Sequence, residues 1–171
     1  TGVTEITVTD LAVHPRSRNS FISVMRGQGA NAQVALVRVD GAGALALVEA
    51  ALAKDPLLTE GWELKGDIAG AQAQRGDAIA SFRKAIETKP NDLLAHYKLI
   101  SLLIQDNKIE DANKQLVAMK KVAPKHSSTL FLQAMLAYHE KNFVAARDAI
   151  QGHLKAAPNS LQGLLLGAQI D

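Results

Sequence analysis

The stretch WELKGDIAGAQAQRGDAIASFRKAIETKP, residues 62–90, decides the fold because its landmarks recur along the chain. It ends at Pro90, and further prolines lie at multiples of 34 residues from it, at Pro56, Pro124 and Pro158. A fixed spacing of this length indicates stacked copies of one supersecondary unit. Each proline lacks an N–H and disfavours helix in the residue before it, so it separates one copy from the next.

Small and bulky residues recur in phase with the prolines. Twelve residues before each proline lies an alanine: Ala44, Ala78, Ala112 and Ala146. Eight residues before it lies a larger apolar residue: Val48, Phe82, Leu116 and Ile150. Five residues before it come Ala51, Ala85, Met119 and His153. The first two positions share one helix face, so the alanine admits a neighbouring helix closely while the larger side chain fills the space.

With Trp62 and Gly66 placed before this set, the second unit resembles the tetratricopeptide (TPR) repeat in both residue type and spacing. The resemblance covers about three quarters of the chain. It implies a mainly α fold, a TPR-type α-solenoid of antiparallel helix pairs, with a short β-rich segment before it.

This register predicts where the units and their helices lie. We expect a half repeat at 44–58, full repeats at 59–92, 93–126 and 127–160, and a partial helix at 161–171. The predicted helices are 44–54, 59–74, 78–88, 93–105, 109–122, 127–139, 143–155 and 160–170. Glycine, asparagine and aspartate predict the turns within pairs, and Gly76-Asp77 is the first of these turns.

Residues 1–43 have a different pattern. Runs rich in β-branched residues at 6–9, 11–13, 20–24 and 34–39 predict strands, separated by turns at 15–19 and 27–31. Residues 12–15 and 36–41 weakly resemble parts of a β-propeller blade. A few strands alone are marginally stable, so we expect this segment to pack on helix 44–54 or to pair its edge with another molecule. A natural fusion, a gene fragment and a chimera all remain open.

Composition excludes several classes of protein. The 171 residues carry a formal net charge of +2, and scattered basic residues without interleaved aromatics argue against nucleic-acid binding. Cysteine is absent, which excludes disulfides and thiolate metal sites. No apolar run approaches the roughly 20 residues of a membrane span. We expect Thr1 and Asp171 to be cuts in a longer product, and the apolar last helix to be truncated, disordered or covered by another chain.

The sequence offers no catalytic constellation. Its five histidines lack a metal-ligand spacing, its Gly-x-Gly pairs lack the context of a phosphate loop, and no nucleophile elbow is present. We therefore expect no catalytic residue, no cofactor and no metal, and a protein that is not an enzyme.

The resemblance places a binding groove on the first helix of each repeat. In such arrays the fifth, ninth, twelfth and thirteenth positions of that helix line the concave face. In this sequence the matching residues are Glu63, Asp67, Tyr97, Ser101, Gln105, Phe131, Met135, Tyr138 and His139. Aromatic residues and methionine make good contacts with a partner. The alternative is that Tyr97, Phe131 and Tyr138 pack against the next helix. The carboxylate clamp of chaperone-binding TPR domains needs basic residues where Glu63 and Asp67 stand, so binding of an acidic C-terminal peptide is disfavoured.

Residues 119–126, 132–138 and 145–150 are similar to TPR lipoproteins of bacterial exosortase (PEP-CTERM) systems. This resemblance implies a periplasmic or cell-surface bacterial scaffold in exopolysaccharide export, and the sequence leaves a cytoplasmic location open. The first hypothesis is a scaffold that binds a protein or peptide in the groove. The second is a subunit that self-associates through the N-terminal strands and residues 160–171.

Overall fold

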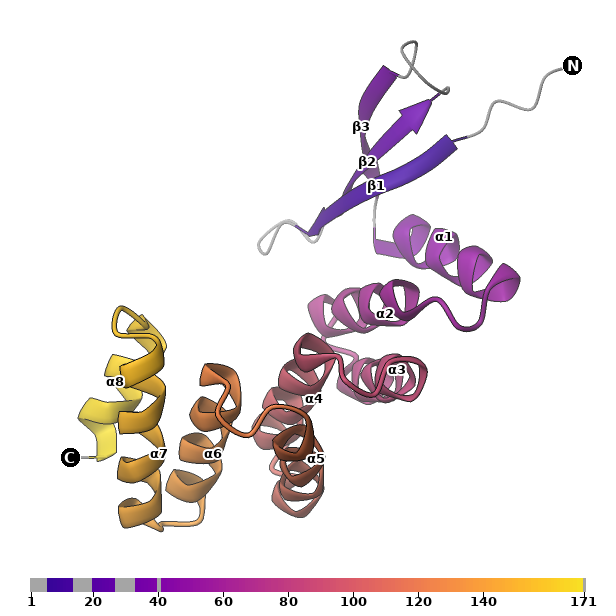
Figure 1. Ribbon diagram of the computed structural model, residues 1–171. Helices are drawn as coiled ribbons and strands as arrows, with labels where there is room; N and C mark the ends of the chain where they lie inside the picture. The colour runs from indigo at the N-terminus through magenta and orange to yellow at the C-terminus, as the bar shows by residue number, and fades with distance from the viewer. Residues whose placement is uncertain (1–5, 14–19, 27–32, 40, 171) are drawn as a thin grey trace, which may run out of the picture. The chain divides into compact units, whose positions relative to one another are not determined.

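The computed structural model describes residues 6–13, 20–26, 33–39 and 41–170, with side chains from residue 43 onward (Figure 1). The chain divides into two units, residues 1–78 and residues 79–171. The turns predicted at 15–19 and 27–31 lie outside the described residues.

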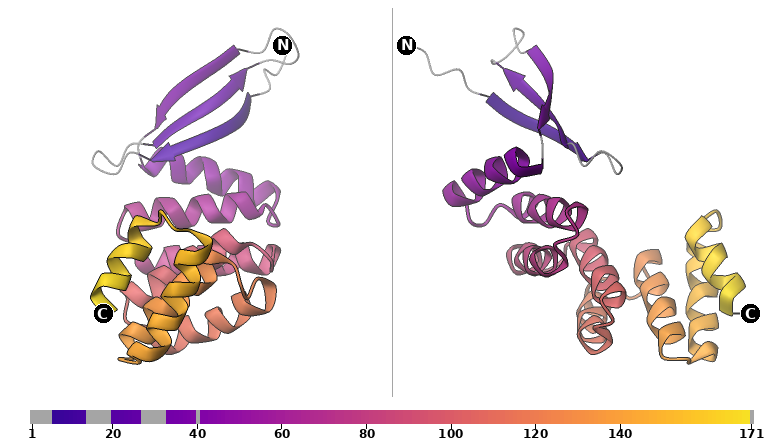
Figure 2. Two further views of the ribbon diagram at one scale, coloured as in Figure 1. Left: turned by 60° about the vertical axis from the view of Figure 1, so that its left-hand side comes forward. Right: turned by 180° about the vertical axis from the view of Figure 1, so that it is seen from behind.

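The first unit begins with three strands, β1 (Ile6–Val13), β2 (Ser20–Arg26) and β3 (Gln33–Val39). They form one antiparallel sheet in the order β1-β2-β3 (Figure 2). Ile6 pairs with Arg26 and Val13 with Ser20, while the β1 register shifts between Val8 and Asp10. In the second ladder Ser20 pairs with Val39. The packing of this segment on helix 44–54 remains a prediction.

Helix α1 (Gly41–Lys54) follows the sheet and packs on α2 (Thr59–Ala71). Ala44, Val48, Leu52 and Ile68 form the buried core of this pair. Trp62 lies half-buried against it and donates its indole N–H to the carbonyl of Pro56 at 2.9 Å. Lys65 of α2 forms an ion pair with Glu49 of α1 at 2.8 Å.

Three predicted boundaries in this region are wrong. α1 begins at Gly41 rather than 44, so Gly41 and Gly43 lie in its first turn of helix. α2 ends at Ala71 rather than 74, and α3 (Arg75–Thr88) begins before 78. Gly76 and Asp77 therefore belong to the start of α3, where an acidic side chain suits the positive end of the helix dipole.

The second unit contains the rest of α3 and five further helices. These are α4 (Leu93–Gln105), α5 (Ile109–Val122), α6 (Ser127–His139), α7 (Phe143–Ala156) and α8 (Leu161–Ile170). α4 packs on α5, α6 packs on α7, and α8 packs on α7 and α6 (Figure 2). These bounds agree with the predicted helices to within one residue at each end.

Three turns join the two helices of a pair, and their backbones are alike. In each, a residue other than glycine is left-handed, with φ of 60° at Ala73, 56° at Asn107 and 61° at Lys141. The N–H of the following residue bonds the carbonyl five residues earlier, with N···O distances of 2.9, 2.8 and 2.8 Å at Gln74, Lys108 and Asn142. A left-handed residue with this bond is a common helix ending. The 34-residue period therefore holds in backbone geometry as well as in sequence.

The recurring small residues occupy the core, as the sequence predicts. Ala44, Ala78, Ala112 and Ala146 are each at most 1% exposed. The larger residues four positions later are also buried: Val48, Phe82, Leu116 and Ile150. The four prolines themselves are exposed, which fits residues that end helices rather than fill the core.

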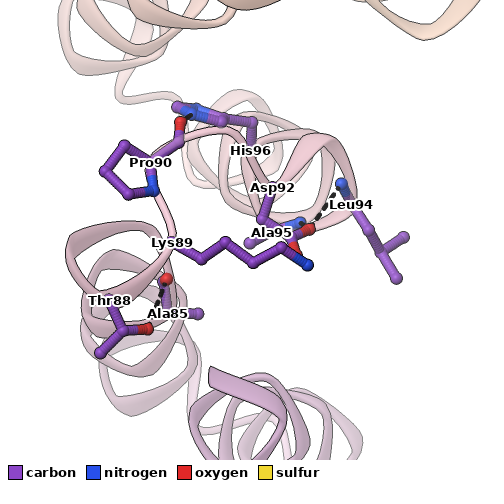
Figure 3. A network of polar contacts seen from close by, with 8 residues as sticks. All are labelled: Ala85, Thr88, Lys89, Pro90, Asp92, Leu94, Ala95 and His96. Atoms are coloured by element: carbon purple, nitrogen blue, oxygen red, sulfur yellow. Dashed lines mark hydrogen bonds and ion pairs between the residues drawn. The ribbon is translucent and has the colours of Figure 1, made fainter. Parts of the chain in front are cut away.

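The junction before α4 shows how one repeat is joined to the next (Figure 3). The Asp92 carboxylate caps α4 by accepting the backbone N–H groups of Leu94 at 3.0 Å and Ala95 at 3.1 Å. It also forms an ion pair with Lys89 at 2.9 Å. Burial raises the pKa of Asp92, but the bonds from Lys89, Ala95 and Leu94 outweigh it, so the pKa lies below the ordinary value of 3.8.

His96, a residue of α4, also bonds to this junction. Its Nε2 lies 3.0 Å from the carbonyl oxygen of Pro90 (Figure 3). A carbonyl only accepts, so Nε2 carries the proton. Trp62 makes the matching bond to Pro56 one repeat earlier. A side-chain N–H at this helix position thus binds the proline carbonyl in two successive repeats.

The last helix docks closely on His153 of α7. His153 is buried, and its Nδ1 lies 2.9 Å from the carbonyl oxygen of Ser127 on α6. Gly163 of α8 faces the other side of the ring, where a Cβ would lie 2.5 Å from His153 Cδ2 and 2.7 Å from Nε2. Only glycine allows this approach, so Gly163 determines how closely α8 packs against His153.

We predict that Asp92→Ala lowers the free energy of unfolding by about 1 kcal/mol through loss of the helix cap. Because folding depresses the pKa of Asp92, its charge-dependent contribution is complete above the ordinary value of 3.8 and is lost as pH falls through the folded value. Urea unfolding of the wild type and of Asp92→Asn at several pH values checks this. If the difference in free energy of unfolding between the wild type and Asp92→Asn stays constant as pH falls below 3.8, the capping role of the Asp92 carboxylate is contradicted.

We also predict that Gly163→Ala lowers the free energy of unfolding by about 1–3 kcal/mol, because the new methyl group collides with His153. The matched control on the same helix is Gly167→Ala, whose Cβ meets Leu154 at an ordinary 3.9 Å. It should be neutral, or stabilising by up to about 1 kcal/mol through helix propensity. Urea unfolding measures both variants, and equal stability of the two would show that α8 does not dock on His153.

Candidate functional site

The predicted groove residues fall on three helices in two units. Glu63 and Asp67 lie half-buried on α2 of the first unit, and each takes part in an interaction within the chain. The remaining seven lie on α4 and α6 of the second unit. The site is therefore built from the second unit alone, and the role of Glu63 and Asp67 remains a prediction.

Of the predicted groove residues on α4, Tyr97 is the one that packs against the core cluster. It is half-buried, and the cluster contains Phe131, Ile150 and Leu166. Its hydroxyl lies 3.5 Å from the side-chain oxygen of Gln162 on α8. Ser101, one helical turn further, is half-buried, and Gln105 is exposed. The hydroxyl of Tyr97 thus extends from the α4 surface toward α8.

On α6, the predicted residues divide between core and surface. Phe131 is only 8% exposed, and its ring centroid lies 5.2 Å from that of His153. It therefore packs against the next helix, which is the alternative that the sequence left open. Met135 and Tyr138 are half-buried against the same cluster, and His139 is exposed. The accessible surface therefore consists of Met135, Tyr138 and His139, with Phe131 beneath it.

A hollow lies where α6 turns into α7. It has a volume of about 320 Å³ and is lined by Tyr138, His139, Lys141 and Phe143. The rings of Tyr138 and Phe143 meet edge to face, with centroids 5.8 Å apart and an interplanar angle of 69°. This geometry suits the ring quadrupoles and holds the two aromatic walls at a fixed angle.

Sequence reasoning finds two of the four residues that line the hollow. Tyr138 and His139 follow from the groove register, whereas Lys141 and Phe143 do not, because they lie in the turn and at the start of the second helix. A comparison of residues 34 positions apart could have found them. Asn107 and Ile109 occupy the corresponding places in the preceding repeat, so Lys141 and Phe143 differ from them in charge and in aromatic character.

Three of the described histidines make hydrogen bonds within the chain. His96 and His153 bind backbone carbonyls, and Nδ1 of His126 accepts the N–H of Ser128 at the start of α6. Within the described ranges, no group of three or more histidine, aspartate or glutamate side chains is placed to hold a metal ion. Among the described helices, none has the length and apolar character of a membrane crossing. His14 lies outside the described residues.

Comparison with known proteins agrees with this architecture. A tetratricopeptide repeat family model matches residues 97–160. A comparison with curated protein sequences finds no match. Among solved structures, MamA from Desulfovibrio magneticus is similar, with a TM-score of 0.66 and 16% identity over 76% of this chain and 73% of that chain.

A second group of similar structures comes from RPAP3. The first TPR domain of human RPAP3 has a TM-score of 0.62 and 14% identity, covering 67% of this chain and 91% of that chain. The first TPR of Spaghetti (RPAP3) bound to the HSP90 peptide SRMEEVD has a TM-score of 0.60 and 13% identity, covering 66% of this chain and 89% of that chain. At such identities the likeness concerns the fold. The helical part of the chain has the fold of tetratricopeptide repeat proteins, with the family model itself matching at residues 97–160.

Proposed function

We propose that this protein is a non-catalytic scaffold that binds a peptide or a partner subunit across α4 and α6. The observation that carries the proposal is that Tyr97, Met135 and Tyr138, from the first helices of two successive repeats, all rest on one core cluster. Their positions are fixed by packing while part of each side chain stays accessible. Large side chains held in this way bind a partner with modest loss of entropy.

Similar structures support the proposal at the level of fold. One of them is a TPR domain of RPAP3 bound to an HSP90 peptide. We further propose that the scaffold acts in exopolysaccharide export at a bacterial cell envelope, where its partner is another protein of the export machinery. This proposal rests on the resemblance to exosortase-associated lipoproteins at residues 119–126, 132–138 and 145–150.

We predict that the double variant Tyr97→Ala and Met135→Ala lowers affinity for groove-bound peptides at least tenfold, as loss of an aromatic hot spot does. Phe131 stays unchanged, because its burial would confound binding with stability. The probes are peptides selected from a phage-displayed random library on the wild type, with affinity measured by fluorescence anisotropy.

The control for this experiment is Val117→Ala with Lys121→Ala on α5, which are exposed and lie on the second helix of their pair. Both double variants should keep the helical circular dichroism of the wild type. Unchanged affinity in the folded Tyr97 and Met135 variant, or an equal loss in the control, would refute the groove assignment.

A second candidate function is self-association. Three leucines of α8 are largely exposed, with exposed fractions of 70% for Leu161, 50% for Leu164 and 57% for Leu165. Exposed apolar side chains grouped on one short helix are typical of an interaction surface. Strands β1 and β3 each pair with one strand only within the described sheet, so the sheet offers edges for the same purpose.

We predict that, if α8 mediates self-association, the wild type shows a molar mass above 18.2 kDa that rises with concentration in light scattering. Leu164→Glu with Leu165→Glu should then restore the monomer, because a charge cannot be buried at a contact without a partner. A wild type that stays monomeric at the highest concentration would exclude this function for α8.

A further inference from the structure

The three turns within helix pairs provide an internal comparison. Ala73, Asn107 and Lys141 share a left-handed backbone and equivalent hydrogen bonds. The same turn therefore forms with an alanine, an asparagine or a lysine at its centre. Side chains that differ between the three turns are not needed to build the turn, so they are available for another role.

The third turn differs from the other two in its side chains. Around it lie Tyr138, His139, Lys141, Phe143 and Val144. The second turn has Ile104, Gln105, Asn107, Ile109 and Glu110 at the same places, and the first has Gly70, Ala71, Ala73, Arg75 and Gly76. Only the third turn combines two aromatic rings with basic side chains. Four of these residues, Tyr138, His139, Lys141 and Phe143, line the hollow described above.

The apolar part of the third turn is accessible. Phe143 is 47% exposed and Val144 is 72% exposed, where the preceding repeat has Ile109 and the charged Glu110. A side chain stabilises the fold in proportion to the apolar area it removes from water, so Phe143 contributes only part, and Val144 little, of what full burial would give. The edge-to-face pair of Tyr138 and Phe143 forms the apolar part of the hollow.

The charge at the hollow is basic. Lys141 and His139 line it directly and are exposed. The neighbouring Glu140 is directed elsewhere, because its carboxylate accepts a 2.6 Å hydrogen bond from the side chain of Asn113 on α5. A left-handed conformation costs a residue such as lysine roughly 1–2 kcal/mol. Asparagine, present at this place in the second turn, tolerates it better, so Lys141 is not the residue that the backbone favours.

We propose that this hollow binds an apolar side chain of a partner peptide that is flanked by carboxylates. The apolar side chain packs between Tyr138 and Phe143, and a carboxylate beside it pairs with the Lys141 ammonium. The inference rests on the proposed scaffold function and names the chemistry of its partner at one end of α6. The acidic ligand follows from charge complementarity with Lys141.

The test uses ¹⁵N-labelled full chain and three capped synthetic peptides at millimolar concentration. One has a central leucine with two glutamates on each side, the second has lysines in place of the glutamates, and the third has serine in place of the leucine. We expect the first peptide to shift the backbone amides of residues 138–144, and the other two to shift them several-fold less.

Two variants test the assigned residues. Lys141→Asn installs the residue of the second turn, so it keeps the backbone conformation while removing the charge. It should weaken binding of the acidic peptide several-fold and remove most of the salt dependence of its affinity. Phe143→Ser should weaken binding at least several-fold at any salt concentration. The matched controls Lys121→Asn and Val117→Ser, exposed on α5, should bind as the wild type does.

Three outcomes would overturn the inference. The first is an equal response to the lysine peptide or the serine peptide. The second is the absence of shifts at 138–144 while library-selected peptides still bind through Tyr97 and Met135, which leaves the proposed function intact. The third is that vesicles of phosphatidylcholine and phosphatidylserine broaden these amides while the acidic peptide does not, which would assign the patch to a membrane surface.

Discussion

The helical architecture depends on one backbone constraint, the left-handed residue that ends the first helix of each pair. At Ala73, Asn107 and Lys141 the chain reverses direction, and the following N–H returns to a carbonyl of the helix just ended. In the second unit, α5 packs on α4 and α7 packs on α6 after such a turn. Ala112 of α5 and Ala146 of α7 are fully buried. After Pro90, the Asp92 cap then starts helix α4.

In this repeated fold, the residues that stabilise the core differ from those that we propose to bind a partner. The buried alanines, the larger apolar residues and the turn backbone are alike in every repeat, so they carry stability. The residues that vary between repeats lie at Tyr97, Met135, Tyr138 and the third turn, where side chains remain accessible. Their rigidity comes from the core cluster beneath them. An array of this kind thus presents a preformed contact surface, which reduces the entropy lost on binding.

The period and the core of the helical part could be predicted from the sequence, because the spacing of proline, alanine and bulky residues reflects packing that repeats in space. The end of α2 could not, since Ala73 gives no sign that it adopts a left-handed angle, whereas Gly76 and Asp77 resemble turn residues. The burial of Phe131 depends on His153, a contact between helices that a groove register does not contain. Lys141 and Phe143 were missed because the register considers first helices only.

The most direct test of the account is an NMR determination of φ at the three turn residues in the full chain. Intraresidue NOE intensities between the amide proton and Hα, with backbone ¹³C shifts, distinguish left-handed from right-handed conformations. We expect a left-handed conformation at Ala73, Asn107 and Lys141, 34 residues apart, with Gly76 and Asp77 helical. A helical Ala73 with a chain break at Gly76-Asp77, or a right-handed Lys141, would contradict it.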